Sequence, residues 1–120
     1  MSALPISNTQ LGNLMHRDID HLTNEEISLI PALQRGYNNF TVPQKRILLG
    51  EIQYYYQLNA YRVPQMDHEA RYLMSWDIAD AINDNRNNVG IPYKVSGLTV
   101  FLLIGTFFNE NFVLEDYDAE

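Results

Sequence analysis

Two polar clusters combine residue types and spacings that could hold a divalent metal ion. In the segment HRDIDH, His16 and Asp20 are four residues apart and would share one face of a continuing helix. Imidazole and carboxylate groups are common metal ligands, and His68 could supply a third. The segment is equally typical of a polar junction between helices, and motifs without structural context are often false matches. A metal-dependent enzyme is therefore the third of three functional hypotheses, and we expect no cofactor.

The second cluster is an acidic stripe in the segment that follows Asp67. Asp77, Asp80 and Asp84 have the spacing i, i+3, i+7, so their carboxylates could share a magnesium ion on one helix face. The favoured alternative is a solvated surface, because charges along a helix usually face water. Trp76 lies at the edge of this stripe, and tryptophan is a frequent anchor of protein interfaces.

Other chemistries find little support in the chain. It contains no cysteine, which excludes disulfides and thiolate metal sites. No serine, threonine or lysine has a recognisable nucleophile context, and no glycine loop has phosphate-binding spacing. We therefore expect a protein that is not an enzyme.

The net charge of −7 is unevenly distributed. Residues 1–94 carry ten acids and eight bases, a balance of −2, whereas residues 95–120 carry five acids and no base. Without a basic stripe for phosphate contacts, direct nucleic-acid binding is not expected. An acidic tail can instead bind a basic protein surface or simply aid solubility. The interface candidates in the tail are Phe112, Leu114, Glu115, Asp116, Tyr117 and Asp118.

The segment 41–61 is predicted to be the central helix of the fold, running from about residue 42 to 61. Thr41 and Gln44 form a capping box, and Pro43 suits the first helical turn. At 100° per residue the apolar side chains form two stripes, so the helix needs cover on two sides. The first stripe contains Ile47, Tyr54, Leu58 and Tyr61, and the second contains Leu48, Leu49, Ile52, Tyr55 and Tyr56.

The three consecutive tyrosines of this helix, Tyr54, Tyr55 and Tyr56, must point in three directions. Tyrosine is enriched at interfaces because it adds contact area at low entropic cost and carries a polar tip. It is equally normal at the edge of a core. All three are therefore interface candidates together with Trp76.

Four further helices are expected around the central one. Capping boxes start helices after Ser7 and Thr23, and Pro31 should interrupt the second of these. Asp67 can cap a helix of about residues 68–84, followed by a loop over 83–90. Ser96 can cap a helix to residue 108, although this run also suits a strand; helix is favoured because no partner strand exists.

These patterns predict an all-α fold: a small bundle of about five helices in one domain, residues 1–108, followed by an acidic tail, 109–120. No apolar run reaches the length of about 20 residues that a membrane span requires, and no secretory signal is evident. A location in the cytoplasm, or within a particle assembled inside the cell, is expected.

The favoured function is non-catalytic interaction or assembly, as a subunit of a homo-oligomer or of a larger complex such as a virus particle. The alternative is a small acidic regulator that binds and blocks a basic protein surface. Charge placement separates the two, because a mimic of nucleic acid needs acids spread over its body and this body carries only −2. The expected partners are proteins, either a second copy or another chain.

Overall fold

The computed structural model describes residues 19, 22–34, 36–109 and 111–112, and every regular element within them is helical. The predicted all-α class is therefore confirmed. The elements are α2 (Asn24–Ser28), η2 (Pro31–Leu33), α3 (Val42–Asn59), η3 (Ala60–Gln65), α4 (His68–Val89) and α5 (Gly97–Phe107). The predicted first helix and the acidic residues after 112 lie outside the described residues, so the five-helix count stays a prediction.

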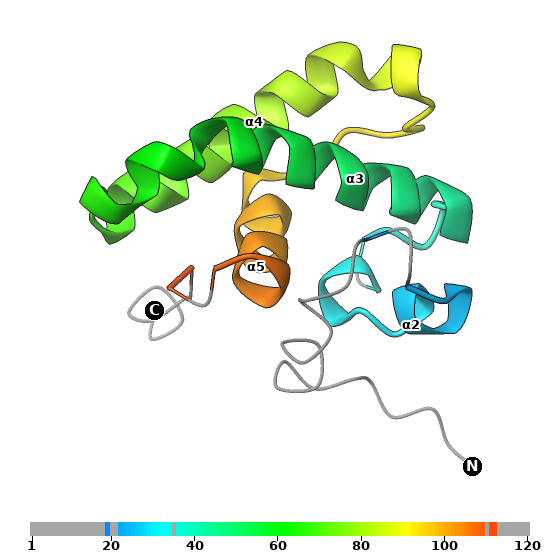
Figure 1. Cartoon of the computed structure of the whole chain (residues 1–120). Coiled ribbons are helices and arrows are strands. Elements are labelled where there is room, and N and C mark those ends of the chain that lie inside the picture. The colour runs from blue at the N-terminus through cyan, green and yellow to red at the C-terminus, as the bar shows by residue number, and fades with distance from the viewer. Residues whose placement is uncertain (1–18, 20–21, 35, 110, 113–120) are drawn as a thin grey trace.

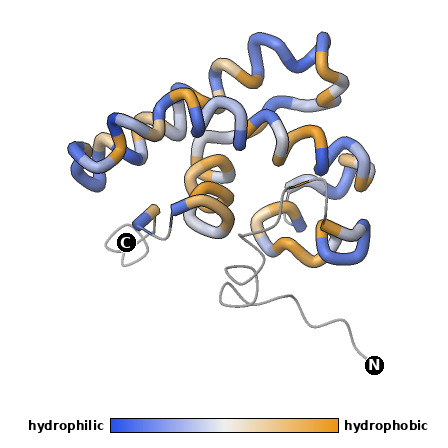
Figure 2. The backbone as a smooth tube through the Cα atoms, in the orientation of Figure 1, coloured by the Kyte–Doolittle hydropathy of each residue, from blue (hydrophilic) through white to orange (hydrophobic). Residues whose placement is uncertain are grey.

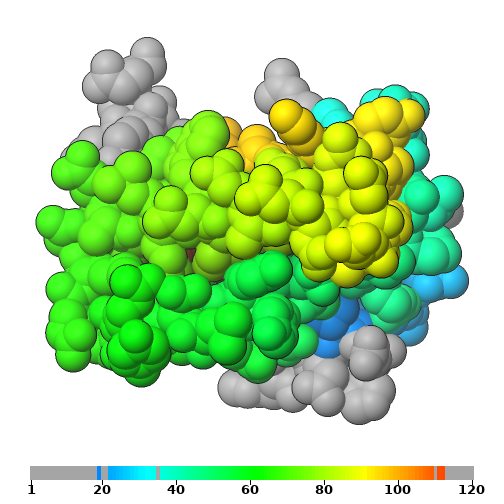
Figure 3. Space-filling view, turned by 90° about the horizontal axis from the view of Figure 1, so that it is seen from above, coloured from blue at the N-terminus to red at the C-terminus, as the bar shows by residue number. Residues whose placement is uncertain are grey.

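The two long helices, α3 and α4, run side by side along one face of the molecule (Figures 1 and 3). Helix α5 lies beneath them and packs against both, while α2 and η2 lie under the start of α3 (Figure 1). Among the described residues, no helix is both long enough and apolar enough to cross a membrane.

Helix α3 begins as the sequence predicts. Thr41 Oγ1 accepts the backbone N–H of Gln44, and Gln44 Oε1 accepts that of Thr41, which closes the capping box. The α-helical part ends at Asn59, two residues before the predicted end, and the chain tightens into η3 as far as Gln65. Pro64 explains this change, because proline supplies no N–H to continue an α-helix.

Helix α4 is longer than predicted, since the expected loop over 83–90 is wrong. The helix continues to Val89 and ends at Gly90, whose φ of 84° provides the left-handed cap. Tertiary contacts hold the added turns. Asn83 Nδ2 donates to the carbonyl of Val95, and Asn83 Oδ1 accepts the N–H of Val95. An asparagine that looks like a loop residue thus pins the returning chain against the helix.

Helix α5 confirms the helical prediction for residues 96–108. Ser96 caps it by accepting the N–H of Thr99, and most of its side chains are buried. Figure 2 shows α5 as a mostly hydrophobic segment beneath the two long helices. A buried polar contact ties it to the loop before α3, because Tyr37 Oη donates to Thr99 Oγ1 at 2.9 Å.

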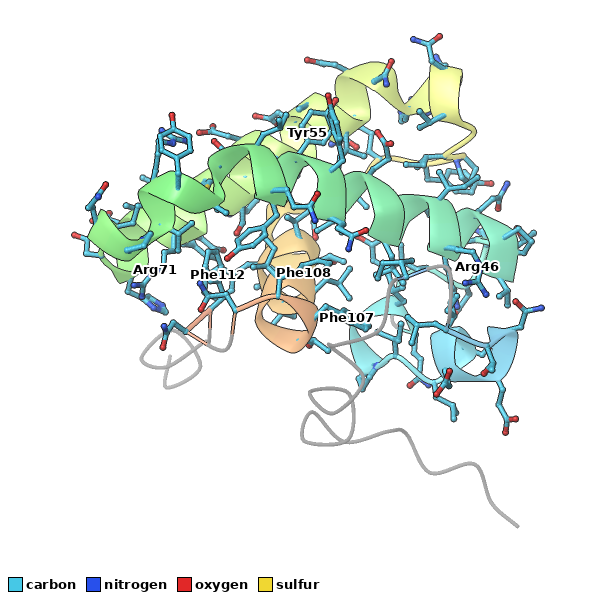
Figure 4. The ribbon with its side chains drawn as sticks, in the orientation of Figure 1. Arg46, Tyr55, Arg71, Phe107, Phe108 and Phe112 are labelled. Carbon is cyan, nitrogen blue, oxygen red and sulfur yellow. The ribbon has the colours of Figure 1, made fainter. Side chains whose placement is uncertain are left out.

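The short region of α2 is held to the rest of the molecule by the buried side chains of Ile27, Ile30 and Leu33 and by one arginine of α3. Thr23 and Glu26 form the predicted capping box, and Pro31 separates α2 from η2, also as predicted. Arg46 reaches from α3 toward this region (Figure 4) and donates to the carbonyls of Ile19 and Leu22 at 2.8 and 2.7 Å. Bonds from a charged donor are stronger than neutral ones, so these bonds add to the apolar contacts of this region.

An aromatic cluster joins α3, α4, α5 and the segment after α5. Phe101 is fully buried, with ring centroids 5.2 Å from Tyr72 and 5.5 Å from Phe112. Tyr56 stacks on Phe108 at 5.7 Å and meets Phe112 at 6.0 Å. Figure 4 shows Phe108 and Phe112 beside α5 and beneath α3. Phe112, beyond the end of α5, is therefore part of the core.

Candidate interaction surfaces

Of the two apolar stripes predicted for α3, the structure buries one and exposes the other. Four residues of the second stripe, Leu48, Leu49, Ile52 and Tyr56, are buried. The first stripe is exposed, and we call its four residues the α3 stripe, although Tyr61 lies in η3, just beyond the end of α3. They are Ile47, Tyr54, Leu58 and Tyr61, with exposed fractions of 37, 55, 55 and 76%. The described part of the chain thus covers one side of α3 and leaves the other open.

Few charged residues of α3 itself border the α3 stripe. Within α3, only Glu51 falls at its margin by helical spacing, and in η3 the exposed Arg62 follows Tyr61. Gly50 lies between Ile47 and Tyr54, and nothing occupies the space within 4 Å of where its Cβ would be. The face is therefore an apolar ridge with a notch one turn before Tyr54.

A second exposed apolar group lies on α4 and the start of α5, formed by Leu73, Trp76 and Leu98. The indole of Trp76 lies over Gly97, and a Cβ at position 97 would be 2.3 Å from its Cδ2 atom. Tyr72 touches the same indole at a centroid distance of 6.2 Å. Trp76 is thus half-exposed but held in place by a glycine beneath it.

Replacing Gly97 with alanine should push this indole outward. The new Cβ cannot share the space, and Trp76 yields because it is at the surface. We expect a loss of about 1 kcal/mol in the free energy of unfolding, as for a moderate surface repacking. Trp76 is the single tryptophan of the chain, so its emission maximum should shift to longer wavelength. Gly50→Ala is the control, and an unshifted spectrum in Gly97→Ala would contradict the packing.

The residues proposed as metal ligands do not form a site in the described part of the chain. Asp77, Asp80 and Asp84 are all exposed on α4, and no group of three or more histidine, aspartate or glutamate side chains there could hold a metal ion. His16 and Asp20 lie outside the described residues. The exposure of these three aspartates agrees with the interpretation of the acidic stripe as a solvated surface.

The structure exposes some of the interface candidates predicted from the sequence and buries others. Tyr54 is exposed, Tyr55 is half-buried and meets Tyr54 edge-on at 5.1 Å, and Trp76 is 43% exposed. Tyr56 and Phe112 require correction, since both are in the core and neither is free to meet a partner. Leu114, Glu115, Asp116, Tyr117 and Asp118 lie outside the described residues.

Three exposed residues of the α3 stripe were not among the site candidates: Ile47, Leu58 and Tyr61. The helical periodicity places them together with Tyr54, so the signal was present in the sequence. What the periodicity could not show was which of the two stripes the rest of the chain covers.

Comparisons with protein-family models, with curated proteins and with solved structures find no match to this chain. The function proposed below therefore depends on the exposure, charge and shape of these surfaces.

Proposed function

We propose that this chain is a non-catalytic interaction or assembly protein whose contact surface is the α3 stripe. The observation that supports this is the exposure of Ile47, Tyr54 and Leu58 on a helix whose opposite side is buried, followed by the exposed Tyr61 in η3. Contiguous exposed apolar surface is unusual on a monomer and is typical of interaction sites. Aromatic side chains at such a site supply much of the binding energy.

The rigidity of the helix favours this role. Both ends of α3 are fixed, by the capping box at Thr41 and by η3, and its buried side packs against α2, α4 and α5. From Ile47 to Leu58 the stripe extends about 16 Å along the helix axis, at 1.5 Å per residue. A helix face held in this way binds a partner helix without the entropic cost of ordering a loop.

The test is the mass of the protein in solution, both purified and in a lysate of its source. A Tyr54→Ser, Leu58→Ser double variant removes apolar area from exposed positions and should keep the fold. We expect the wild type to exceed the chain mass of 13.9 kDa in at least one condition, and the variant to show at least about tenfold weaker association.

Gln57→Ser is the matched control, because residue 57 is an exposed polar position on the same helix. Circular dichroism should show equal helix content in all three proteins. A wild type that remains a 13.9 kDa monomer at about 100 μM, where a complex with a micromolar dissociation constant would be populated, and also in the lysate would overturn the proposal.

A further inference from the structure

The exposed face of α4 carries charge of one sign only. Its exposed residues include the acids Glu69, Asp77, Asp80 and Asp84 and the apolar Leu73 and Trp76, and the rest are asparagines. At 100° per residue these side chains share one face, on the side away from the buried Met74, Ile78 and Ile82. Figure 3 shows α4 along the outer surface of the molecule beside α3. The exposed residues of this helix thus carry no positive charge.

The carboxylates of this face have no compensating charge in the described part of the chain. Asp77 and Asp84 lie three and four residues from Asp80, the spacing at which like charges on a helix repel each other. No lysine or arginine lies three or four residues from any of the three, and none of them forms an ion pair or hydrogen bond with a described residue. Lysine or arginine side chains of a partner would therefore remove a repulsion that the free chain retains.

Apolar side chains lie at one end of this row of acids. Leu73 is 56% exposed, Trp76 is 43% exposed, and Leu98 at the start of α5 is 39% exposed. The indole of Trp76 is held over Gly97, so it is in position before a partner arrives and loses little freedom on binding. Tryptophan is among the residues that contribute most to protein interfaces. The face thus combines an ordered apolar anchor with acids that continue from Asp77 toward the end of the helix.

The order of these side chains along α4 defines what the partner must present. From Leu73 to Asp84 the face extends about 16 Å along the helix axis, at 1.5 Å per residue, which is about three helical turns. A partner helix of that length would place apolar side chains against Leu73 and Trp76. Its next turns would place lysine or arginine against Asp80 and Asp84, with the spacing of an amphipathic helix.

Charge disfavours the other partners that an exposed tryptophan can meet. An anionic membrane surface would repel the carboxylates of this face, and so would the phosphates of a nucleic acid. A second copy of the same face would oppose acid to acid, and like charges brought together across an interface are costly. A basic amphipathic segment of another protein is complementary both to the acids and to the apolar anchor.

We propose that the exposed face of α4 binds a basic amphipathic helix of another protein. Leu73 and Trp76 are the apolar anchors, and Asp77, Asp80 and Asp84 pair with lysines or arginines of the partner. This inference does not rest on the proposed function, because the α3 stripe takes no part in the contact. Exposed ion pairs are weak and are screened by salt, so we expect a dissociation constant of about 1–100 μM at low salt and weaker binding as salt rises.

A synthetic helical peptide tests this contact with the full-length protein. The peptide carries leucines at one end of a face and lysines along the rest of it at spacing i, i+3, i+7, and it contains no tryptophan. A control peptide has the same composition with its lysines on the opposite face. Trp76 is the single tryptophan of the chain, so its emission reports on this site. We expect the emission maximum to move to shorter wavelength with the patterned peptide and not with the control.

Two double variants with the same change in charge locate the contact. Asp77→Lys, Asp80→Lys should weaken binding at least about tenfold, because it replaces two attractions by two repulsions. Glu25→Lys, Glu51→Lys, on α2 and α3, is the matched control and should bind within about twofold of wild type. Leu73→Ser should weaken binding about fivefold through the lost apolar contact. Circular dichroism should show equal helix content in all these proteins.

The reversed charges also provide a rescue. A peptide with glutamates in place of its lysines should bind the Asp77→Lys, Asp80→Lys variant and not the wild type. Equal binding of the patterned and control peptides, or equal losses in the two double variants, would overturn the inference, because the net acidity of the chain would then hold the peptide. Binding that leaves the emission of Trp76 unchanged, or that is lost in the Tyr54→Ser, Leu58→Ser variant, would place the peptide elsewhere and overturn it as well.

Discussion

Replacing Phe112 with alanine should destabilise the protein by about 3–5 kcal/mol, the range for removal of a large buried aromatic ring. Phe112 is only 2% exposed and meets the rings of Phe101 and Tyr56. Because α3 and α5 both contribute to this contact, the cavity cannot close without moving a long helix. Chemical denaturation followed by circular dichroism measures the loss. A change below about 1 kcal/mol would mean that this ring is not in the core.

A substitution of Gly105, the α5 residue that faces the backbone of Phe112, tests the same contact. An added Cβ would be 2.0 Å from the carbonyl oxygen of Phe112, a backbone atom that cannot rotate away. Elsewhere in a helix, glycine to alanine stabilises by about 1 kcal/mol. We expect Gly105→Ala to destabilise, and Gly50→Ala, whose added Cβ meets nothing, to stabilise. The opposite signs of two identical substitutions make a sensitive measurement.

The two changes at this contact should not be additive. Once alanine at 105 has displaced the segment, removing the ring of Phe112 costs less, because the ring has already left its site. Neighbouring substitutions that share one contact typically couple by about 0.5–3 kcal/mol. Full additivity in the Gly105→Ala, Phe112→Ala double variant would contradict the shared contact.

Local chemistry allowed much of the fold to be predicted. The capping boxes at Thr23 and Thr41 and the cap at Ser96 are all present, since each depends on residues three positions apart. Such short-range bonds can be recognised without knowing the fold. The same holds for the interruption of α2 at Pro31, which follows from the missing N–H.

Long-range contacts explain what the sequence did not predict. Phe112 follows a helix and precedes a run of acids, so it resembled part of a tail; only the packing against Phe101 shows otherwise. Likewise, two stripes of similar hydrophobicity on α3 gave no indication of which one the other helices cover. The packing of α4 and α5 on the opposite side of α3 determines which stripe is exposed.

The end of α4 is a further case, and it leads to the second large expected effect. Asparagine has low helix propensity, so the run 83–90 predicted a loop. The side chain of Asn83 instead bonds both backbone groups of Val95, at 2.9 Å for its carbonyl and 2.7 Å for its N–H. Val95 is only 4% exposed, so water is a poor substitute for either bond. These two bonds thus hold the chain just before α5 against α4, in addition to the apolar packing between the two helices.

Asn83→Ala should therefore cost about 2–4 kcal/mol, because it leaves a buried N–H and a buried carbonyl without partners, each worth about 1–3 kcal/mol. Asn83→Asp should cost at least as much at neutral pH. Its carboxylate can still accept the N–H of Val95, but its second oxygen would face the carbonyl that the amide now donates to. Both variants are measured by urea denaturation against wild type.

Asn87→Ala is the matched control, since residue 87 is an exposed asparagine of the same helix. Alanine has the higher helix propensity, so this change should be neutral or stabilise by about 0.5 kcal/mol. If Asn83→Ala and Asn87→Ala had equal effects, helix propensity alone would govern this end of α4. A large loss confined to position 83 would show that the bonds to Val95 hold the end of α4 against the start of α5.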